Sequence, residues 1–502
     1  MLQRGGADLT IAGGVREFGH ATPRAIAVRD GERHLTYAAL DDRSSRLAQA
    51  LLARGVRPGE RVAALLGNRL EYPEIAAGLA KAGLVLVPLN PRLRAPEIEF
   101  IVRHAEARAL ILDDAYAAEA AGAAADLGLT LSLDGTSLGP SYNEALDAAA
   151  ATDPAVLVNE RDPFCVTYTS GTTGDPKGVQ ISHRSRVLTF YAAALEWGLG
   201  PGRRTLAVAP MYHGAGFAFA YAGVFCGGTV SMLRSFDPAE VLRLAEADGI
   251  QSMFLVPTHA QLIRSLTESP HRPSELDTLY FNAAALPRPL KDWVLDAFPG
   301  VGVHELYGST EGGVVTNLRP ADARRKAGSV GHPWFATEVR VVGEEGQPVP
   351  PGTPGELFSR SPYLMNGYLH NEAATAACTT ADGFLTAGDI VVRDEEGYIT
   401  IVDRKKDVII TGGVNVYPRE VEEALVTHPD VVEAAVVGEA DPQWGERVVA
   451  VLVCRRPIDE NAVTEHLRTR LAGYKLPKAY RSVAALPRNA AGKVLKRELR
   501  GD

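Results

Sequence analysis

The sequence predicts an α/β fold with a large, multi-subdomain amino-terminal domain and a small α+β carboxy-terminal domain. Apolar, strand-like runs at 61–66, 84–89 and 164–168 occur among helical patterns, which is typical of mostly parallel sheets. At 502 residues the chain is too long for one ordinary hydrophobic core, so two or more domains are expected.

The first elements expected along the chain are a hairpin and two helices. Residues 25–37 contain two short strand-like runs on either side of Asp30-Gly31, which predicts a hairpin. The leucine spacing that follows predicts a helix ending at Gly55. A second helix is expected over 71–82, and the alanine-rich stretch 115–125 predicts an exposed helix.

The boundary of the small domain is expected at five consecutive charged residues, 403–407, a composition typical of a solvated linker. This places the amino-terminal domain at 1–404 and the carboxy-terminal domain at 405–502. Within the latter, strands are expected at 408–410, 434–437 and 448–454, and helices at 418–426 and 461–471.

Composition excludes several classes of function. The formal net charge of −9 gives no basic surface for nucleic acid and no polybasic membrane anchor. No apolar run is long enough to span a membrane, and the first residues lack the apolar core of a signal peptide. The four cysteines stand far apart, without zinc-site or disulfide spacing, which favours a cytoplasmic protein.

A run of hydroxyl residues and glycines after the strand at 164–168 predicts a polyphosphate site. Glycines allow backbone N–H groups to turn toward an anion, hydroxyls donate hydrogen bonds to phosphate oxygens, and a lysine adds a cation. The sequence departs from the Walker pattern, because Pro176 precedes the lysine and Gly178 follows it. An ordinary polar turn is the alternative. The candidate ligands are Thr169, Ser170, Gly171, Thr172, Thr173 and Lys177.

Over residues 168–179 the order of residue types resembles the phosphate-binding loop of the adenylate-forming superfamily. This superfamily includes acyl-CoA synthetases, luciferases and the adenylation domains of peptide synthetases. Further motifs follow in the expected order, so the resemblance covers essentially the whole chain. It implies ATP and Mg²⁺ as ligands, coenzyme A as a cosubstrate, and a small domain that moves about a hinge at Lys406.

A second motif is Tyr307-Gly-Ser-Thr-Glu-Gly-Gly313. Alone, it is also compatible with a helix cap. The resemblance implies that Tyr307 stacks on adenine, Thr310 bonds the α-phosphate and Glu311 holds the metal ion. An aromatic face, a hydroxyl and a carboxylate suit these three roles.

The resemblance assigns the ribose to Asp389 and Arg404. An ionised aspartate accepts hydrogen bonds from both ribose hydroxyls. The family usually places a threonine directly before the Gly-Asp pair, and this chain has Ala387 there. The ribose role of the aspartate is retained, while neighbouring nucleotide contacts are open.

Three further assignments also come from the resemblance. Gly412 and Gly413 would lie along the pantetheine of CoA, although the family often has glutamate where this chain has Val414. Lys493, inside a Pro…Gly-Lys frame, would enter the site when the small domain closes and serve adenylation. His213 matches a position near the acyl carboxylate.

Together these motifs imply an acyl-CoA synthetase: a carboxylic acid attacks the α-phosphate of MgATP, and the CoA thiol then displaces AMP from the acyl-adenylate. Small residues in the segments that match the acyl pocket favour a bulky apolar acid over acetate. Gly214 and Ala215, after His213, argue against amino-acid substrates. The pocket candidates are Gly214, Ala215, Ala283, Ala284 and Gly312.

Three alternatives stay open. The chain could load a carrier-protein thiol instead of CoA. It could perform only the second half-reaction, from a preformed acyl-adenylate to CoA. It could also bind nucleotide without catalysis. The resemblance leaves room for a homodimer.

Overall fold

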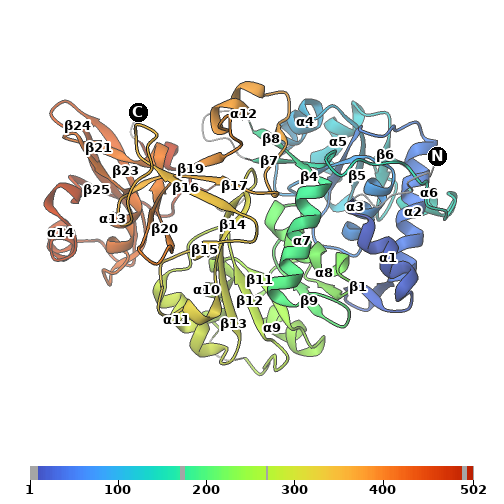
Figure 1. Ribbon diagram of the computed structural model, residues 1–502, viewed down its shortest axis with the longest axis horizontal. Coiled ribbons are helices and arrows are strands. Elements are labelled where there is room, and N and C mark those ends of the chain that lie inside the picture. Colours follow the sequence, from blue (N-terminus) through green and yellow to red (C-terminus); the bar gives the residue numbers. More distant parts are fainter. Residues whose placement is uncertain (1–8, 170–175, 267–268, 489–493, 501–502) are drawn as a thin grey trace. The chain divides into compact units, whose positions relative to one another are not determined.

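The computed structural model describes residues 9–169, 176–266, 269–488 and 494–500, and contacts divide the chain into two compact units (Figure 1). Unit 1 comprises Met1–Glu338 with Ser359–Leu385, and unit 2 comprises Val339–Phe358 with Thr386–Asp502. Separate clusters of buried apolar residues form in the two units. Each unit therefore has a core of its own.

The first sheet of unit 1 contains the three strand-like runs that the sequence indicates. Its order is β18-β8-β7-β4-β3-β5-β6. The strands are β3 (Arg61–Leu65), β4 (Val85–Leu89), β5 (Ala107–Leu112), β6 (Thr130–Ser132), β7 (Pro163–Thr169), β8 (Lys177–Ser182) and β18 (Gly367–Tyr368). Pairing is parallel from β6 to β7, and β8 and β18 add antiparallel strands at one edge. Parallel strands need crossover connections, which α3 (Glu71–Lys81) and α4 (Ala95–His104) supply.

The second sheet of unit 1 is larger and also mostly parallel. Its order is β15-β14-β13-β12-β11-β9-β10-β1-β2. The strands are β1 (Ile26–Asp30), β2 (Arg33–Thr36), β9 (Arg204–Ala207), β10 (Thr229–Met232), β11 (Ser252–Leu255), β12 (Thr278–Phe281), β13 (Gly302–Ser309), β14 (Gly313–Leu318) and β15 (His332–Pro333). Pairing is parallel from β1 to β13 and antiparallel at β2, β14 and β15.

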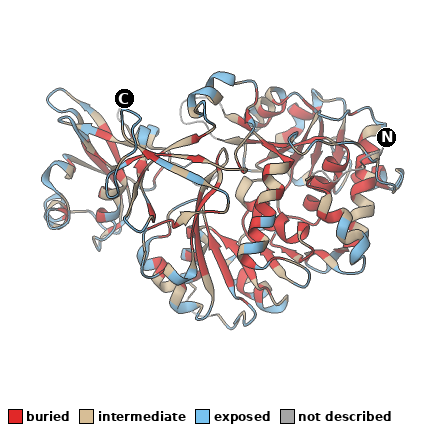
Figure 2. Cartoon of the chain, viewed as in Figure 1, coloured by how far each residue is buried: buried red, intermediate tan, exposed pale blue. Residues whose placement is uncertain are grey.

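One helix, α8 (Gly214–Phe225), is buried along nearly its whole length, because its sequence is apolar on every face. It belongs to a cluster that includes Leu86 of the first sheet and Val230 of the second, so the main core joins both sheets (Figure 2). The other helices of unit 1 are α1 (Gly13–Ala21), α2 (Tyr37–Ala53), α5 (Ala117–Ala125), α6 (Tyr142–Asp147), α7 (His183–Trp197), α9 (Pro238–Ala247), α10 (Pro257–Arg264), α11 (Arg288–Ala297) and α12 (Glu372–Cys378).

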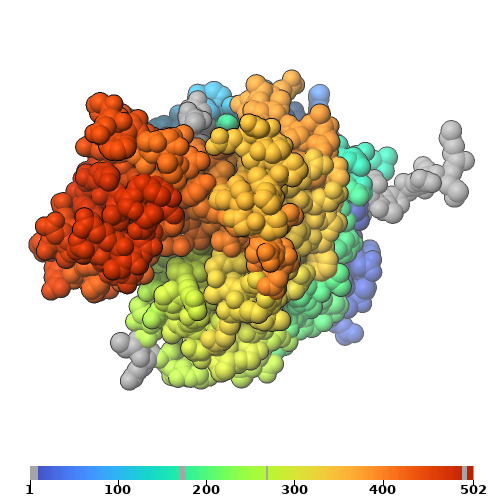
Figure 3. Space-filling view, turned by 60° about the vertical axis from the view of Figure 1, so that its left-hand side comes forward, coloured from blue at the N-terminus to red at the C-terminus, as the bar shows by residue number. Residues whose placement is uncertain are grey.

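Unit 2 holds two small sheets, and its residues 386–488 are orange to red in Figure 3. The first sheet has β16 (Glu338–Val342), β17 (Gly355–Arg360), β19 (Leu385–Arg393) and β20 (Ile399–Arg404). The second has β21 (Ile409–Thr411), β22 (Val414–Val416), β23 (Val431–Asp441), β24 (Gly445–Cys454) and β25 (Ala479–Ser482). Its helices are α13 (Pro418–Leu425) and α14 (Glu460–Arg468).

These elements confirm the predicted α/β class, the hairpin β1–β2 and the first helices, α2 and α3. Three details differ from expectation. The helix α5 is not exposed on all sides, since Ala120 and Ala123 are buried beside α4. The helix expected over 461–471 ends at Arg468.

The third difference concerns the charged run 403–407. Asp403 is buried, and its carboxylate accepts the backbone N–H of Arg419 at 2.8 Å. The first part of this run therefore belongs to strand β20 and is not a solvated linker. By contacts, the last segment of unit 2 begins at Thr386, because β19 and β20 pair with each other. The boundary after residue 404 and the hinge at Lys406 stay predictions.

Within the described ranges, none of the helices combines the length and the apolar character that crossing a bilayer requires.

Candidate active site

The predicted phosphate loop is closed by a hairpin between β7 and β8. Thr169, the last residue of β7, pairs with Lys177, the first residue of β8. This register fixes the two ends of the glycine-rich segment beside each other. The predicted ligands Ser170, Gly171, Thr172 and Thr173 lie outside the described residues.

The second motif forms the turn between β13 and β14. Tyr307 lies in β13 and is 8% exposed, and the pairing of the two strands ends at Ser309 and Gly313. The backbone N–H of Gly312 donates to Ser309 Oγ at 2.9 Å. Because Ser309 stabilises a hairpin turn, the alternative of a helix cap is wrong. Thr310 and Glu311 lie at the tip of this turn.

The structure brings Lys177 and Glu311 together at a residue that the sequence did not single out, Tyr368. Its hydroxyl donates to Glu311 Oε1 at 2.9 Å, and Lys177 Nζ lies 5.1 Å from the centre of its ring. Burial and the neighbouring carboxylate raise the pKa of this phenol, so it stays protonated as a donor. Tyr368 lies in β18, which pairs with β8, and thereby connects the two motifs.

The surroundings of Glu311 fit a magnesium ion that also binds phosphates. Among described residues no lysine or arginine forms an ion pair with its carboxylate, and one oxygen accepts the Tyr368 hydroxyl. Within the same ranges no cluster of three or more acidic, histidine or cysteine side chains forms a metal cage. Mg²⁺ typically uses one or two carboxylates and completes its shell with phosphates and water. Glu311, a single carboxylate that shares the neighbour Tyr368 with Lys177, meets that requirement.

His213 immediately precedes helix α8, whose first residues are Gly214 and Ala215. Burial first, and then the charge of Arg92, lower the pKa of His213 to about 4, so the imidazole is neutral at pH 7. A cavity of about 10 Å³ lies beside His213 and Gly214. Its other lining residues include Tyr72, Phe164, Thr167 and Arg186.

The remaining pocket candidates lie elsewhere in unit 1. Ala283 and Ala284 are exposed residues between β12 and α11, and Ala283 has a φ of +74°. Gly312 lies in the β13–β14 turn, next to Glu311. Their assignment to an acyl pocket stays a prediction.

In unit 2, Asp389 and Arg404 face each other across β19 and β20 and form an ion pair of 2.5 Å. Asp389 is 3% exposed, and Arg404 also donates to the Ala387 carbonyl at 3.3 Å. The two predicted ribose residues are therefore adjacent. The methyl group of Ala387 cannot supply the hydroxyl of the usual threonine.

The predicted CoA glycines form the turn of the β21–β22 hairpin. Gly412 has a φ of +58° and Gly413 a φ of +78°, conformations that a residue with a Cβ adopts only with strain. The turn therefore requires glycine at both positions regardless of any ligand. Burial lowers the pKa of Lys406, the predicted hinge residue. Lys493 lies outside the described residues.

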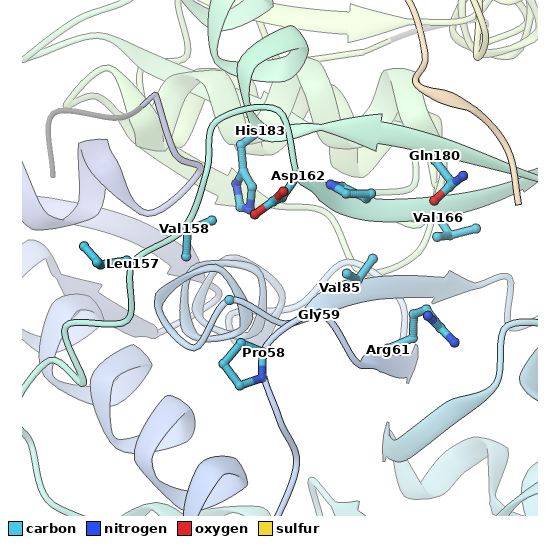
Figure 4. Close-up of a pocket in the computed structure, with 12 residues that line it drawn as sticks. Pro58, Gly59, Arg61, Val85, Leu157, Val158, Asp162, Val166, Gln180 and His183 are labelled. Carbon is cyan, nitrogen blue, oxygen red and sulfur yellow. The ribbon is translucent and has the colours of Figure 1, made fainter.

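Another cavity, of about 310 Å³, opens between β3, β4, β7 and the segment 157–163 (Figure 4). Pro58, Leu157 and Val158 supply apolar walls. The His183 ring also lines it, although Nδ1 accepts the backbone N–H of Ile11 at 3.2 Å. None of the predicted site residues lines this cavity, so it is separate from the candidate active site.

Two family models match the chain. The model described as AMP-binding enzyme matches residues 15–369, and the AMP-binding enzyme C-terminal domain matches residues 420–493.

Individual proteins match over nearly the whole length. A feruloyl-CoA synthase from Amycolatopsis sp is 39% identical, covering 95% of this chain and 96% of that protein. A 2-succinylbenzoate–CoA ligase from Bacillus licheniformis is 32% identical, covering 97% and 98%. The solved o-succinylbenzoate CoA synthetase from Bacillus subtilis, in complex with its acyl-adenylate intermediate, is 29% identical with a TM-score of 0.88, covering 98% of both chains. The same enzyme has also been solved with ATP and magnesium ion.

Proposed function

The chain belongs to the AMP-binding enzyme family, and we propose which of its residues carry the two steps of an acyl-CoA ligase. It is an AMP-forming acid–thiol ligase that uses ATP, Mg²⁺ and CoA. A carboxylate oxygen attacks the α-phosphorus of ATP and pyrophosphate leaves. The CoA sulfur then attacks the acyl carbon, and AMP leaves as the thioester forms.

The observation that carries the assignment of residues is the junction of Lys177, Tyr368 and Glu311. A cation from the phosphate loop and a carboxylate from the second motif lie around one phenol. In our proposal Lys177 contacts the phosphates and Glu311 holds Mg²⁺, which would neutralise negative charge on them. Thr310 bonds the α-phosphate and Tyr307 stacks on adenine. Catalysis is then positioning and charge stabilisation, with no residue covalently modified.

Further roles toward the nucleotide are proposed for residues of unit 2 and for residues of the loop around 169–177. Asp389 accepts the ribose hydroxyls, and its ion pair with Arg404 holds the carboxylate in place. Thr169 and the hydroxyls at 170, 172 and 173 bond phosphate oxygens. Lys493 neutralises charge in the adenylation step, and the turn at Gly412–Gly413 lies along the pantetheine in the second step.

The acid is held, we propose, at the amino-terminal end of α8, with His213 beside its carboxylate. A neutral imidazole suits this place, because it can donate a hydrogen bond to the substrate carboxylate without adding a second positive charge near the metal ion. The adjacent Gly214 and Ala215 support an acid larger than acetate, and the feruloyl-CoA synthase among the relatives supports an acid with an apolar body.

Carrier-protein loading, a homodimer and a cytoplasmic location also remain proposals. The four free cysteines support a reducing compartment. The alternative of a single half-reaction is disfavoured by the fit of Glu311 to a metal ion, which the second step would not need.

The test mixes the protein with MgATP, CoA and a pool of diverse carboxylic acids and searches for new acyl-CoA masses. Wild type should form a thioester, and Lys493→Ala should lower its rate about 10²–10³-fold, as expected for loss of a charge-stabilising donor. Given the preformed acyl-adenylate of the same acid, both proteins should form thioester at similar rates. Silence from wild type with ATP, but product from the preformed adenylate, would establish the half-reaction instead. A parallel reaction with a carrier protein tests the acceptor.

A further inference from the structure

The cavity between β3, β4, β7 and the segment 157–163 is large enough for a small organic molecule (Figure 4). Its volume of about 310 Å³ falls at the lower end of the range for ligand pockets in proteins. Because one water molecule takes up roughly 30 Å³ of liquid, the cavity has room for about ten non-hydrogen atoms. All of its lining residues belong to unit 1.

His183 is a polar side chain buried at this cavity. It is 1% exposed, and Figure 4 shows its ring pointing into the space beside Asp162. Its Nδ1 accepts the backbone N–H of Ile11 at 3.2 Å, and burial lowers the pKa of the ring to about 3, so the imidazole is neutral at pH 7. A neutral imidazole that accepts at Nδ1 carries its proton on Nε2. His183 Nε2 is therefore a hydrogen-bond donor.

This donor has no acceptor in the described part of the chain. The Asp162 carboxylate accepts the backbone N–H of Asn159 at 3.1 Å, and among the described residues it forms neither a hydrogen bond nor an ion pair with the imidazole. Buried polar groups are nearly always hydrogen-bonded, and one left without a partner is destabilising. An acceptor from outside the chain is therefore expected at His183 Nε2.

The other walls of the cavity are mainly apolar, so water alone fills it poorly. Val85 and Val166 are buried, Val158 is half-buried, and Leu157 at the mouth is 83% exposed. Water against such walls is less favourable than an apolar group in the same place. The expected occupant therefore combines an apolar body with a hydrogen-bond acceptor.

The charged residues of the lining favour a neutral occupant. Arg61 donates to the Ala105 carbonyl and to the Glu106 carboxylate, and Figure 4 shows its guanidinium turned away from His183. Asp162 is exposed, so water screens its charge, but it lies where it would repel a carboxylate. The lining thus offers no free cation for an anionic ligand and no buried carboxylate for a cationic one.

We propose that this cavity is a second small-molecule site, which takes a neutral organic compound with an apolar body and an oxygen acceptor, such as a carbonyl, bound to His183 Nε2. None of the residues assigned to ATP, the acid or CoA lines it. The inference therefore does not rest on the proposed function, and either of the two can fail without the other.

The experiment uses four compounds whose non-hydrogen atoms have the same arrangement: acetophenone, α-methylstyrene, benzoate and benzamidine. Ligand-observed NMR titration at pH 7.5 gives their dissociation constants. Acetophenone should bind with a constant of about 0.1–1 mM, as expected for a ligand of this size. α-Methylstyrene has a methylene group in place of the carbonyl oxygen and should bind at least about fivefold more weakly, the effect of one lost hydrogen bond. Benzoate and benzamidine should also bind more weakly, because each brings a charge.

Two variants place the bound compound. Val158→Trp fills the cavity and should weaken acetophenone binding at least about tenfold. Val432→Trp, the same substitution at an exposed valine of β23, should bind it like wild type. If Val158→Trp does not fold, Leu157→Ala decides, since it removes an apolar contact at the exposed mouth and should weaken binding about two- to fivefold. Its control is Leu195→Ala, at an exposed leucine of α7.

The role of His183 is tested by the preference for the carbonyl compound. His183→Phe should bind acetophenone and α-methylstyrene equally, whereas Gln180→Met, at another polar residue of the lining, should keep the preference. Equal binding of the two compounds by wild type would overturn the proposal. So would acetophenone binding that neither Val158→Trp nor Leu157→Ala weakens, or tighter binding of benzoate in the cavity. Absence of binding by all four compounds would overturn it as well.

Discussion

The Tyr368 hydroxyl donates a 2.9 Å hydrogen bond to Glu311 Oε1, while Lys177 Nζ lies 5.1 Å from the centre of the same ring. One side chain thus touches the residues assigned to the metal ion and to the phosphates. It lies in β18, a strand of two residues that pairs with β8, the strand that follows the predicted phosphate loop. Tyr368 is therefore placed to orient both groups without reacting itself.

Tyr368→Phe keeps the ring beside Lys177 and removes the donor to Glu311. We expect kcat for adenylation to fall about 5- to 10-fold, the effect of losing one hydrogen bond of roughly 1 kcal/mol. The Mg²⁺ concentration for half-maximal rate should rise, because the carboxylate is less firmly oriented. A magnesium titration of pyrophosphate release measures both. Tyr191→Phe, at an exposed tyrosine of α7, is the control. An unchanged magnesium dependence would contradict the positioning role.

Glu311→Gln is a harsher change at the same junction. The amide retains an oxygen for the Tyr368 hydroxyl but loses the negative charge that a hard cation requires. Adenylation should fall at least about 10²-fold, in the range seen for loss of one preorganised electrostatic contact. Thioester formation from a preformed acyl-adenylate should be much less affected. Equal losses in the two half-reactions would argue that Glu311 has a structural role.

Sequence reasoning placed the first strands and helices of unit 1 correctly because these elements follow simple periodic patterns. The strands near 61–66, 84–89 and 164–168 are mostly buried. A parallel strand that is buried on both faces has apolar residues at nearly every position, which makes it easy to find in a sequence. The same reasoning failed at 403–407. The run of charged residues there predicted a solvent-exposed linker. The Asp403 carboxylate is instead buried and accepts the backbone N–H groups of Arg404 and Arg419, and these hydrogen bonds form only in the tertiary fold.

The site shows the same limit. Motif order identified Glu311 and Lys177, but nothing local marks Tyr368, which lies 57 residues from its partner in a strand too short for a pattern. Arg184 and Arg186 look alike in sequence, and only the fold pairs the first with Glu160 and leaves the Nε of the second buried without a partner. Contacts between distant segments decide how two similar residues are paired.

Ala283 offers a test of strain in the segment after β12. Its φ of +74° is a conformation that costs a residue with a Cβ roughly 1–2 kcal/mol. Ala283→Gly should remove that cost. Because glycine has more conformational freedom in the unfolded chain, part of the gain is offset, and the free energy of unfolding should rise by up to about 1 kcal/mol. Ala284→Gly, without a positive φ at its position, should lower it by about 0.5 kcal/mol. Urea unfolding of both variants measures the difference, and the same sign for both would contradict the strain.

His183 should make the protein sensitive to acid. Its ring is 1% exposed, its Nδ1 accepts the Ile11 N–H, and burial lowers its pKa to about 3. Because the unfolded histidine titrates near 6.5, the unfolded state binds more protons between pH 6.5 and 3. The contribution of His183 to the stability of the folded protein relative to the unfolded chain is therefore greatest above about pH 6.5 and decreases as the pH falls toward 3.

From pH 7.5 to pH 5.5 the loss amounts to about 1.4 kcal/mol for one such histidine. Asparagine at position 183 retains an acceptor for the Ile11 N–H and cannot titrate. The urea midpoint of His183→Asn should therefore fall less between these two pH values than that of wild type. His20→Asn, at an exposed position of α1, should show the wild-type fall. If His183→Asn and His20→Asn lose the same stability over this interval, the buried ring does not control the acid response.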